Sequence, residues 1–516
     1  MRAFWLACVC TLSLLGGCTA YDVERTMLTP DSLRTLNDAG IRQLEVSSPY
    51  VKAHLKSGNL FRFDAWTIHT ESSTITGHAI LFNASRDTLS QGTYSLGFDS
   101  IAILETNVVR NSGSAVAITV FMGITAAVAV NCIANPKSCF GSCPTFYADD
   151  GDGPRLQAEG FSSSIAPALE AADIDALFHA QARDGEIAVI MKNEAFETHV
   201  VRHVDLLALQ HREGSRTFVT PDGQFWESPS QLTPRSATAP EGDCLSSLAA
   251  ADGNERYSLA DADYLGAKEE VTLNFLVEPG KPYGLVLGCR QTLLPTYLLY
   301  QTFAYMGSDA ARWIAQLGQQ EIREPDRMAG LIGGIEIFVP GRGGEPVFAG
   351  LLNEHGPLAV DMHLMQLPAF TDTAATIQLR MTKGTWRIDY AGLAELSRRV
   401  EPARVQPAIV LKGGVEDEHA RGALTDSARV LISLPGDEYT LRYRLPHSGG
   451  PYEYFIESRG YYLEWIRQEW IREENPLFLS QMFLDPEGAL RRMTPEFKKV
   501  EPDMEECFWR SRYARP

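Results

Sequence analysis

Short runs in which apolar and polar residues alternate recur throughout this 516-residue chain, and they constrain its fold most strongly. The first is a hairpin pattern, in which Tyr50–Leu55 and Leu60–Trp66 flank a glycine-containing turn at 56–59. Similar runs occupy 73–82, 92–105, 186–191, 200–209, 271–275, 335–339, 375–381 and 385–389. Because successive side chains of a strand point to opposite faces, this period favours strands that are buried on one side. The sequence therefore predicts a mainly β, α+β fold made of several antiparallel modules.

The length and the order of these runs predict several domains. We expect a signal peptide at 1–17, a linker at 18–47, a small antiparallel sheet or barrel at 48–110, a hydrophobic segment at 113–134, a β-rich domain ending in a helix at 135–325, a second β-rich, sandwich-like domain at 326–460, and a helical tail at 461–516. The prolines at 476, 486, 495 and 502 suit first helical turns. The tail aromatics Phe483, Phe497, Phe508, Trp509 and Tyr513 are expected to dock the tail on the body.

Two segments of the chain are similar to each other and suggest an internal duplication. Glu270–Phe275 followed by Pro282–Arg290 matches Glu438–Tyr443 followed by Pro451–Arg459 in its glutamate, Thr-Leu, Pro-Tyr and arginine positions. An aromatic-rich helical pattern follows each copy, at 293–306 and at 461–471. This predicts a repeated unit of two antiparallel strands and a helix. Generic strand composition is the alternative explanation.

The N-terminus has the features of an export signal. Arg2 precedes an uncharged apolar run at 4–15 that is too short to span a bilayer. The run ends in Leu-Gly-Gly-Cys18, which resembles a lipobox, so we expect cleavage before Cys18 and acylation of its thiol. Two or three acyl chains suffice for lasting membrane attachment. Thr19 in place of aspartate resembles an outer-membrane address, and this predicts a lipid-anchored protein of the bacterial cell envelope.

A second apolar stretch, at 113–134, is long enough to span a bilayer but only moderately hydrophobic. Its alanines, Gly123 and hydroxyl residues leave three alternatives open: a helix buried within the protein, a helix that dips into the membrane, and a true span.

The most distinctive string of the chain is Cys139-Phe-Gly-Ser-Cys143-Pro-Thr-Phe-Tyr147. It resembles a segment of a group of exported bacterial proteins with a Cys-Phe-Gly-Ser-Cys-Pro-Thr-aromatic-Tyr motif. The similarity extends to Ser100–Asn107, Glu197-Thr-His199, Ser458–Tyr462 and the tail. It implies no catalytic residue. In an oxidising compartment Cys139 and Cys143 are candidates for a structural disulfide, with each other or with Cys132, and a redox pair is the alternative.

Few residues suggest metal chemistry. His199 and His203 would meet on one metal if they lay on a helix, but the β-branched residues around them favour a strand, where they would be about 13 Å apart. The Asp149-Asp-Gly-Asp-Gly153 string has calcium-like spacing without the later glutamate of an EF-hand, which favours a tight turn. We therefore expect neither a metal nor another cofactor.

The composition and the missing motifs favour binding over catalysis. The net charge of −19 argues against nucleic acid as a partner. The chain has no nucleophile elbow, phosphate loop or dinucleotide fingerprint. The sequence thus predicts a non-catalytic binding or scaffold module that contacts the membrane through its lipid and an envelope protein or glycan through its body. The alternatives are an envelope hydrolase with a carboxylate or metal site and a transport or assembly accessory.

Overall fold

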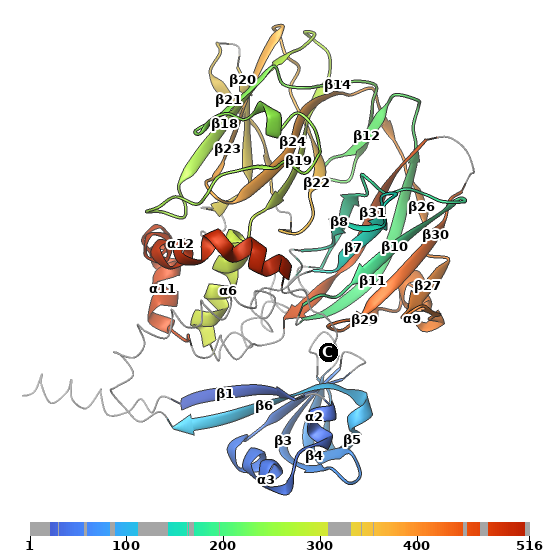
Figure 1. Cartoon of the computed structure of the whole chain (residues 1–516), viewed down its shortest axis with the longest axis vertical. Coiled ribbons are helices and arrows are strands. Elements are labelled where there is room, and N and C mark those ends of the chain that lie inside the picture. The colour runs from blue at the N-terminus through green and yellow to red at the C-terminus, as the bar shows by residue number, and fades with distance from the viewer. Residues whose placement is uncertain are drawn as a thin grey trace, which may run out of the picture. The chain divides into compact units, whose positions relative to one another are not determined.

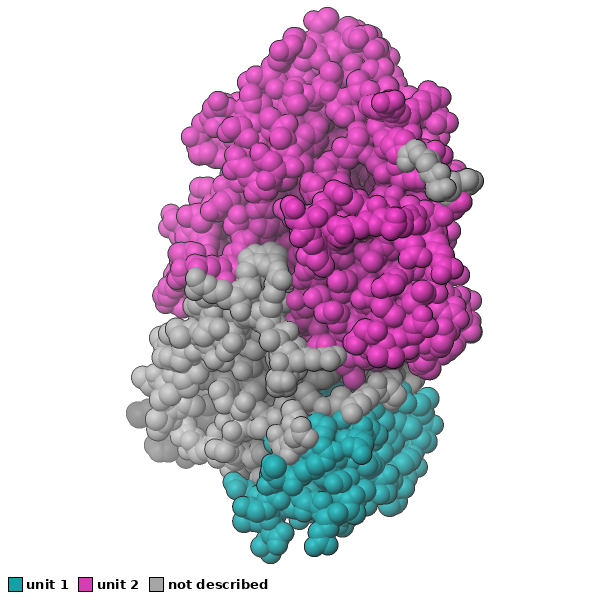
Figure 2. Space-filling view, turned by 45° about the vertical axis from the view of Figure 1, so that its right-hand side comes forward, with its two compact units in different colours: residues 1–129, 306–308, 467–474 teal, residues 130–305, 309–466, 475–516 magenta. Residues whose placement is uncertain are grey.

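The computed structural model describes residues 21–28, 30–55, 59–82, 88–111, 143–162, 164, 170–195, 197–307, 332–341, 343–353, 356–446, 451–464 and 473–510. The chain forms two compact units, the first made of residues 1–129 with short pieces at 306–308 and 467–474, and the second of the remainder (Figure 2). Five sheets are present among the described residues, and nearly all of their strand pairs are antiparallel (Figure 1). The predicted mainly β, α+β class is confirmed.

The first unit is built on an open six-stranded sheet, which we call sheet A. Its order is β1 (Tyr21–Leu28), β6 (Ile101–Asn111), β2 (Val51–Leu55), β3 (Leu60–His69), β4 (Thr74–Phe82) and β5 (Thr88–Gly97). The short helix η1 (Phe98–Ser100) precedes β6. The hairpin predicted around 56–59 is present, because β2 pairs antiparallel with β3.

The prediction of a linker at 18–47 was wrong. Its residues form β1, which pairs along its whole length with β6, and the helices α2 (Pro30–Arg34) and α3 (Asp38–Ser47). Leu33 and Ile41 from these helices are buried in the same core as Phe63 and Leu104. The polar residues between these few apolar positions hide the pattern in the sequence.

A β-sandwich of two sheets, B and C, forms one half of the second unit. Sheet B runs β28 (Val415–Glu416), β27 (Ile409–Lys412), β30 (Glu438–Arg444), β10 (Glu186–Lys192), β7 (Thr145–Asp149), β8 (Pro154–Glu159). Sheet C runs β26 (Ala403–Val405), β11 (Glu197–Gln210), β31 (Tyr452–Glu464), β9 (Ala171–Ala176), and β29 (Leu431–Ser433) also pairs with β11. A shared core that includes Val189, Val204, Leu441 and Ile456 joins the two sheets. The helix α9 (Glu418–Thr425) adds Ala420, Ala423 and Leu424 to this core.

A second sandwich, of sheets D and E, completes this unit. Sheet D runs β14 (Gln231–Leu232), β24 (Trp386–Glu395), β19 (Tyr283–Gln291), β22 (Asp361–Gln366), β12 (Arg216–Val219), β13 (Phe225–Ser228), β25 (Arg398–Val400), with β17 (Arg256–Tyr257) beside β24. Sheet E runs β16 (Gly242–Asp243), β15 (Ser236–Ala239), β18 (Lys268–Leu276), β23 (Ala374–Thr382), β20 (Ile335–Pro340), β21 (Pro346–Leu352). The short helix η3 (Leu245–Ser247) lies between β16 and β17 in the chain. Leu273, Leu287, Ile377 and Ile388 belong to the core between the two sheets.

The boundary predicted near residue 326 does not follow the sheets. All strands between 216 and 400 belong to the second sandwich, whereas the first sandwich pairs strands from 145–210 with strands from 403–464. The second sandwich is thus inserted into the first. Alternation along a strand shows which residues are buried but not which distant strand pairs with it, so the sequence could not reveal this insertion.

The two sandwiches also pack on each other through the outer faces of sheets C and D. Leu207, Leu209 and Phe455 of sheet C share a buried cluster with Phe225 and Val286 of sheet D. The outer face of sheet C is therefore partly covered.

The predicted duplication is present in part. β18 and β19, like β30 and β31, are successive strands, but the two members of each pair lie in opposite sheets of one sandwich and do not pair with each other. Each copy is thus an arch rather than a hairpin. The helix α6 (Leu294–Met306) follows the first copy. In the second, β31 continues through Tyr461 to Glu464, because both tyrosines at 461 and 462 are buried opposite β11, so the helix predicted from 461 was wrong there.

The C-terminal tail is helical as predicted. It contains α11 (Pro476–Leu484) and α12 (Pro486–Arg510), and Pro476 and Pro486 are their first residues. The prolines at 495 and 502 lie inside α12 instead of beginning new helices. Phe497 is buried, with its ring centroid 5.1 Å from that of Tyr297 in α6, which confirms the docking predicted for this aromatic.

The segment at 113–134 falls outside the described residues, so its three alternatives stay open. Among the helices that the structure does describe, none is both long and apolar enough to cross a membrane.

Candidate functional site

An irregularity in β11 decides where the two histidines of the predicted metal motif point. The register between β11 and β31 shifts between Val201 and His203. Such a bulge inserts one residue and reverses the alternation of side chains. His199 therefore lies on the inner side with the core residue Val201, whereas His203 lines a groove on the outer side. The two histidines thus lie on opposite faces of β11, whereas residues four apart share a face in a regular strand.

His199 forms a buried pair with Glu197 inside the first sandwich. Nε2 of His199 lies 2.6 Å from Oε1 of Glu197, and both side chains are fully buried. The ring of Phe161 packs edge-on against the imidazole, at 6.5 Å between centroids. Because both side chains are fully buried, we assign them a structural role.

A polar groove occupies the part of sheet C that sheet D leaves uncovered. Along β11 the outward residues change from His203 and Asp205 to Leu207 and Leu209, so one end of the strand is polar and the other enters the apolar seam. β31 shows the same pattern, because Glu457 and Arg459 are charged and lie at the polar end, whereas Phe455 belongs to the apolar seam. The groove has a volume of about 410 Å³, within the range of ligand sites. The residues that line this sheet C groove are Glu170, Arg202, His203, Asp205, Arg404, Gln406, Leu424, Thr425, Ser427 and Arg459.

Two arginines of the groove share one carboxylate. Nε of Arg202 and Nε of Arg459 donate to the two oxygens of Glu170, at 3.0 and 2.9 Å. The side chains of the arginines are 39% and 50% exposed. Among the described residues no acceptor contacts the terminal nitrogens of either guanidinium. The pair thus brings two guanidinium groups, joined through one carboxylate, to the lining of the groove.

The remaining charges form a second network around Glu457. Nε2 of His203 lies 3.0 Å from one oxygen of Glu457, and Arg404 donates to both oxygens at 2.7 and 2.5 Å. Arg404 also donates to Asp205 at 2.9 Å. The hydrogen bond with His203, assisted by those from Arg404, lowers the pKa of Glu457 to about 2 despite partial burial. The two carboxylates raise the pKa of Arg404 above its ordinary value, so Arg404 stays charged.

Replacing Glu457 by glutamine is expected to remove an acid-sensitive part of the stability. A carboxylate whose pKa is lower in the folded chain stabilises it above the unfolded value of 4.5, and this contribution disappears as the pH falls from there to about 2. With solvent screening we expect about 1–2 kcal/mol. Melting temperatures between pH 7 and pH 2 should fall more steeply in the wild type than in Glu457→Gln. Parallel pH profiles would contradict the assignment.

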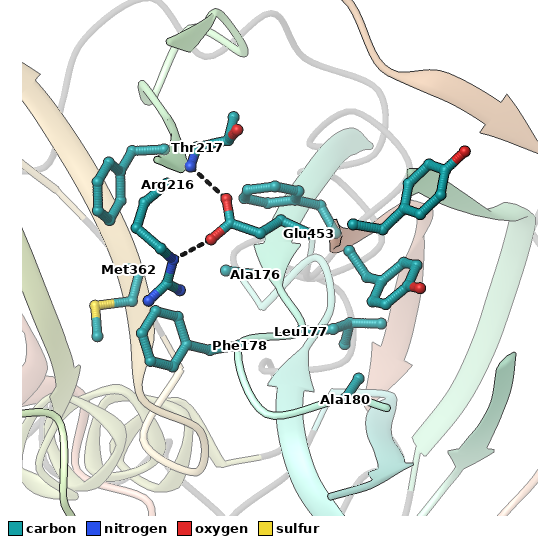
Figure 3. Close-up of a pocket in the computed structure, with 12 residues that line it drawn as sticks. Ala176, Leu177, Phe178, Ala180, Arg216, Thr217, Met362 and Glu453 are labelled. Carbon is teal, nitrogen blue, oxygen red and sulfur yellow. Dashed lines mark hydrogen bonds and ion pairs between the residues drawn. The ribbon is translucent and has the colours of Figure 1, made fainter. Parts of the chain in front are cut away.

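A smaller pocket lies at the seam between the two sandwiches (Figure 3). Glu453 of β31 accepts hydrogen bonds from Nε of Arg216 and from the backbone N–H of Thr217 in β12, and the Arg216 guanidinium lies 4.3 Å from the ring centroid of Phe178. The pocket has a volume of about 50 Å³, enough for a few waters but far below that of ligand sites. We interpret these hydrogen bonds as a structural contact that joins β31 to β12.

The other residues singled out in the sequence are placed as follows. Cys18 and Cys139 lie outside the described residues, and Cys143 is buried just before β7, so both the acylation and the disulfide stay predictions. In the aspartate string, Asp149 and Asp150 accept hydrogen bonds from the backbone N–H groups of Gly151 and Asp152, which confirms a tight turn between β7 and β8. Within the described part of the chain no group of three metal-ligating side chains is found.

Most residues of the groove could not be identified from the sequence. Glu170, Arg202, Arg404 and Arg459 were not connected with His203, because they come from segments up to 289 residues apart. One signal of the groove is present in the sequence of β11. Its alternate positions are His203 and Asp205, which are polar, and then Leu207 and Leu209, which are apolar. A single change of this kind along one face is typical of a strand that is covered over only part of its length.

Comparisons with known proteins add no function. No protein-family model matches the chain, and no curated protein matches it. Among solved structures, a GH31 α-xylosidase from Xanthomonas citri is 10% identical with a TM-score of 0.15, over 80% of this chain and 38% of that one. This chain thus spans well under half of the xylosidase. The structure of the infectious bursal disease virus Gx strain is 9% identical, with a TM-score of 0.12, over 93% of this chain and 90% of that one. The VP2 subviral particle of infectious bursal disease virus is 10% identical, with a TM-score of 0.13, over 95% of this chain and 93% of that one.

Proposed function

We propose that the protein is a non-catalytic lipoprotein of the bacterial cell envelope, anchored through Cys18, whose sheet C groove binds an anionic group of an envelope partner. The observation that carries the proposal is the pair of half-exposed arginines, Arg202 and Arg459, held through their Nε atoms by Glu170. Guanidinium groups bind carboxylate and phosphate by two parallel hydrogen bonds. Held in this way, the two side chains lose less conformational freedom on binding.

Further residues of the groove support binding rather than turnover. Arg404 adds a third, permanently charged guanidinium, and Gln406, Thr425 and Ser427 supply neutral polar groups at the rim. The carboxylates Asp205 and Glu457 are committed to Arg404, and Glu170 is committed to the other two arginines. A general acid or base would need a carboxyl group poised near neutral pH, whereas the pKa of Glu457 lies at about 2.

Changing Arg202 and Arg459 together to glutamine is expected to weaken binding of anionic polymers at least about tenfold, since two charge-assisted contacts are lost. The full chain in detergent would be tested against polygalacturonate, which carries carboxylates, polyphosphate, and neutral dextran. Arg183→Gln is the control, because Arg183 is also an exposed, ion-paired arginine but lies outside the groove. Equal binding by the double variant and the control, or no binding of either polyanion by the wild type, would refute the proposal.

A further inference from the structure

The outer face of sheet E carries an ordered row of side chains across five strands. The strand register aligns Thr238 of β15, Thr272 of β18, Gln378 of β23, Phe338 of β20 and Phe348 of β21. Their neighbours along β18, β23 and β20 point into the core between sheets D and E, so the row itself faces outward. Adjacent members lie about 4.8 Å apart in the direction of pairing. We call this surface, together with the rows on either side, the sheet E face.

One flanking row is polar and hydrogen-bonded. Asn274 donates from Nδ2 to the hydroxyl of Ser236 at 3.0 Å and accepts from the hydroxyl of Thr376 at 2.8 Å. All three residues sit on the surface of the sheet, so amide and hydroxyl groups are fixed in place but accessible. Such groups exchange hydrogen bonds with other hydroxyls.

The other flanking row is charged but largely compensated. Arg380 lies directly opposite both Glu270 and Glu336, and its Nε is 3.8 Å from the Glu336 carboxylate. The face therefore has little net charge. The one arginine of this row is paired with glutamate, and no pair of exposed arginines like that of the sheet C groove is available here to bind an anionic group.

The β21 end of the face is apolar. Phe348 is 55% exposed, and Leu351 is 39% exposed. The rings of Phe338 and Phe348 contact each other edge to face, with 5.8 Å between centroids and 72° between planes. Large exposed aromatics in a cluster mark an interaction surface.

The β21 edge of sheet E is unsuited to accepting another strand. β21 is the outermost strand, but Pro346 and Pro340 pair with each other at its start, and the register shifts between Ile337 and Phe338. Proline and a bulge both oppose strand addition at an edge. At this end of the sheet, the exposed face is therefore a better binding surface than the edge.

We propose that the sheet E face binds an extended, neutral polysaccharide of β-linked pyranose rings. The flat C–H faces of such rings stack on the exposed phenylalanines, and their equatorial hydroxyls meet Gln378, Thr272 and the Ser236–Asn274–Thr376 row. This site is separate from the sheet C groove in both residues and chemistry. The groove takes charged groups through arginines, whereas the sheet E face takes uncharged ones through aromatic and amide groups.

The test is affinity electrophoresis of the full chain in detergent, in native gels cast with glycol chitin or with hydroxyethyl cellulose. We expect at least one polymer to retard the wild type, and Phe348→Ala to weaken the retardation about tenfold, because stacking area is lost. Gln378→Ala should weaken it as well. Val415→Ala is the control, since Val415 is 70% exposed but lies in sheet B.

Three outcomes would overturn the proposal. They are no retardation in either gel, equal retardation of Phe348→Ala and Val415→Ala, and self-association in sedimentation that Phe348→Ala removes without any retardation of the wild type. The last would identify the face as a protein interface. Salt separates this site from the groove: retardation here should persist at 0.5 M NaCl, and Arg202→Gln with Arg459→Gln should leave it unchanged.

Discussion

Cys18→Ala should abolish acylation and lipoprotein processing of the full chain. The wild type should sediment entirely with membranes, because each buried methylene of an acyl chain contributes about 0.8 kcal/mol and two or three chains make release negligible. The variant has no thiol at the cleavage position and should appear as an unprocessed precursor or as released protein. Fractionation after growth with labelled palmitate measures both effects.

The control for this experiment is Cys143→Ala, which also removes one cysteine but leaves the lipobox intact. It should retain both the label and the membrane fractionation. Labelled fatty acid on Cys18→Ala, or unchanged sedimentation of that variant together with normal processing, would contradict lipid anchoring at Cys18.

Arg290→Ala is expected to destabilise the second unit by about 3–5 kcal/mol, because it breaks a nearly buried ion-pair network. Arg290 of β19 donates to Glu255 at 2.5 and 2.7 Å, to Glu505 of α12 at 2.5 Å, and to the carbonyl of Pro357 at 2.8 Å. Arg387 pairs with the same two glutamates. Without Arg290, Glu255 and Glu505 lose one of the positive charges that compensate them in a poorly hydrated place.

Urea unfolding followed by far-ultraviolet circular dichroism would measure this loss. Arg421→Ala is the matched control, since Arg421 forms an exposed pair with Glu418 on α9 that should contribute less than about 1 kcal/mol. Limited proteolysis should also release α12 from the Arg290→Ala protein first, because Glu505 is one of its attachments to the sandwich. A loss below about 1 kcal/mol would show that apolar contacts such as Phe497 against Tyr297 suffice to hold the tail.

The strands were largely predictable from the sequence, but their partners were not. The alternating runs at 335–339 and 375–381 became β20 and β23, because each has one face in the core of the second sandwich. Pairing such as that of β10 with β30 joins segments about 250 residues apart, and local patterns carry no information on it. The same limit hid the insertion of one sandwich into the other.

The candidate site was less predictable than the fold, for two physical reasons. The bulge between Val201 and His203 turns His199 inward and His203 outward, and a single added residue in a strand leaves no mark on composition. The groove also depends on what sheet D covers, since Leu207 and Leu209 are buried by another module while Asp205 on the same face is not in that apolar cluster. The change from polar to apolar residues along β11 is present in the sequence, but it can be interpreted only once it is known which face of the strand points outward.

Photocrosslinking in intact cells at Ser427 tests most directly whether the groove binds an envelope partner. Ser427 is exposed at the rim of the sheet C groove, and Val415, exposed in sheet B away from the groove, serves as the reference position. With a photoreactive residue at each position in turn, the proposal predicts a discrete adduct from 427, none from 415, and loss of the 427 adduct when Arg202 and Arg459 are glutamine. No adduct from 427, or an adduct that persists without the two arginines, would contradict binding through the groove.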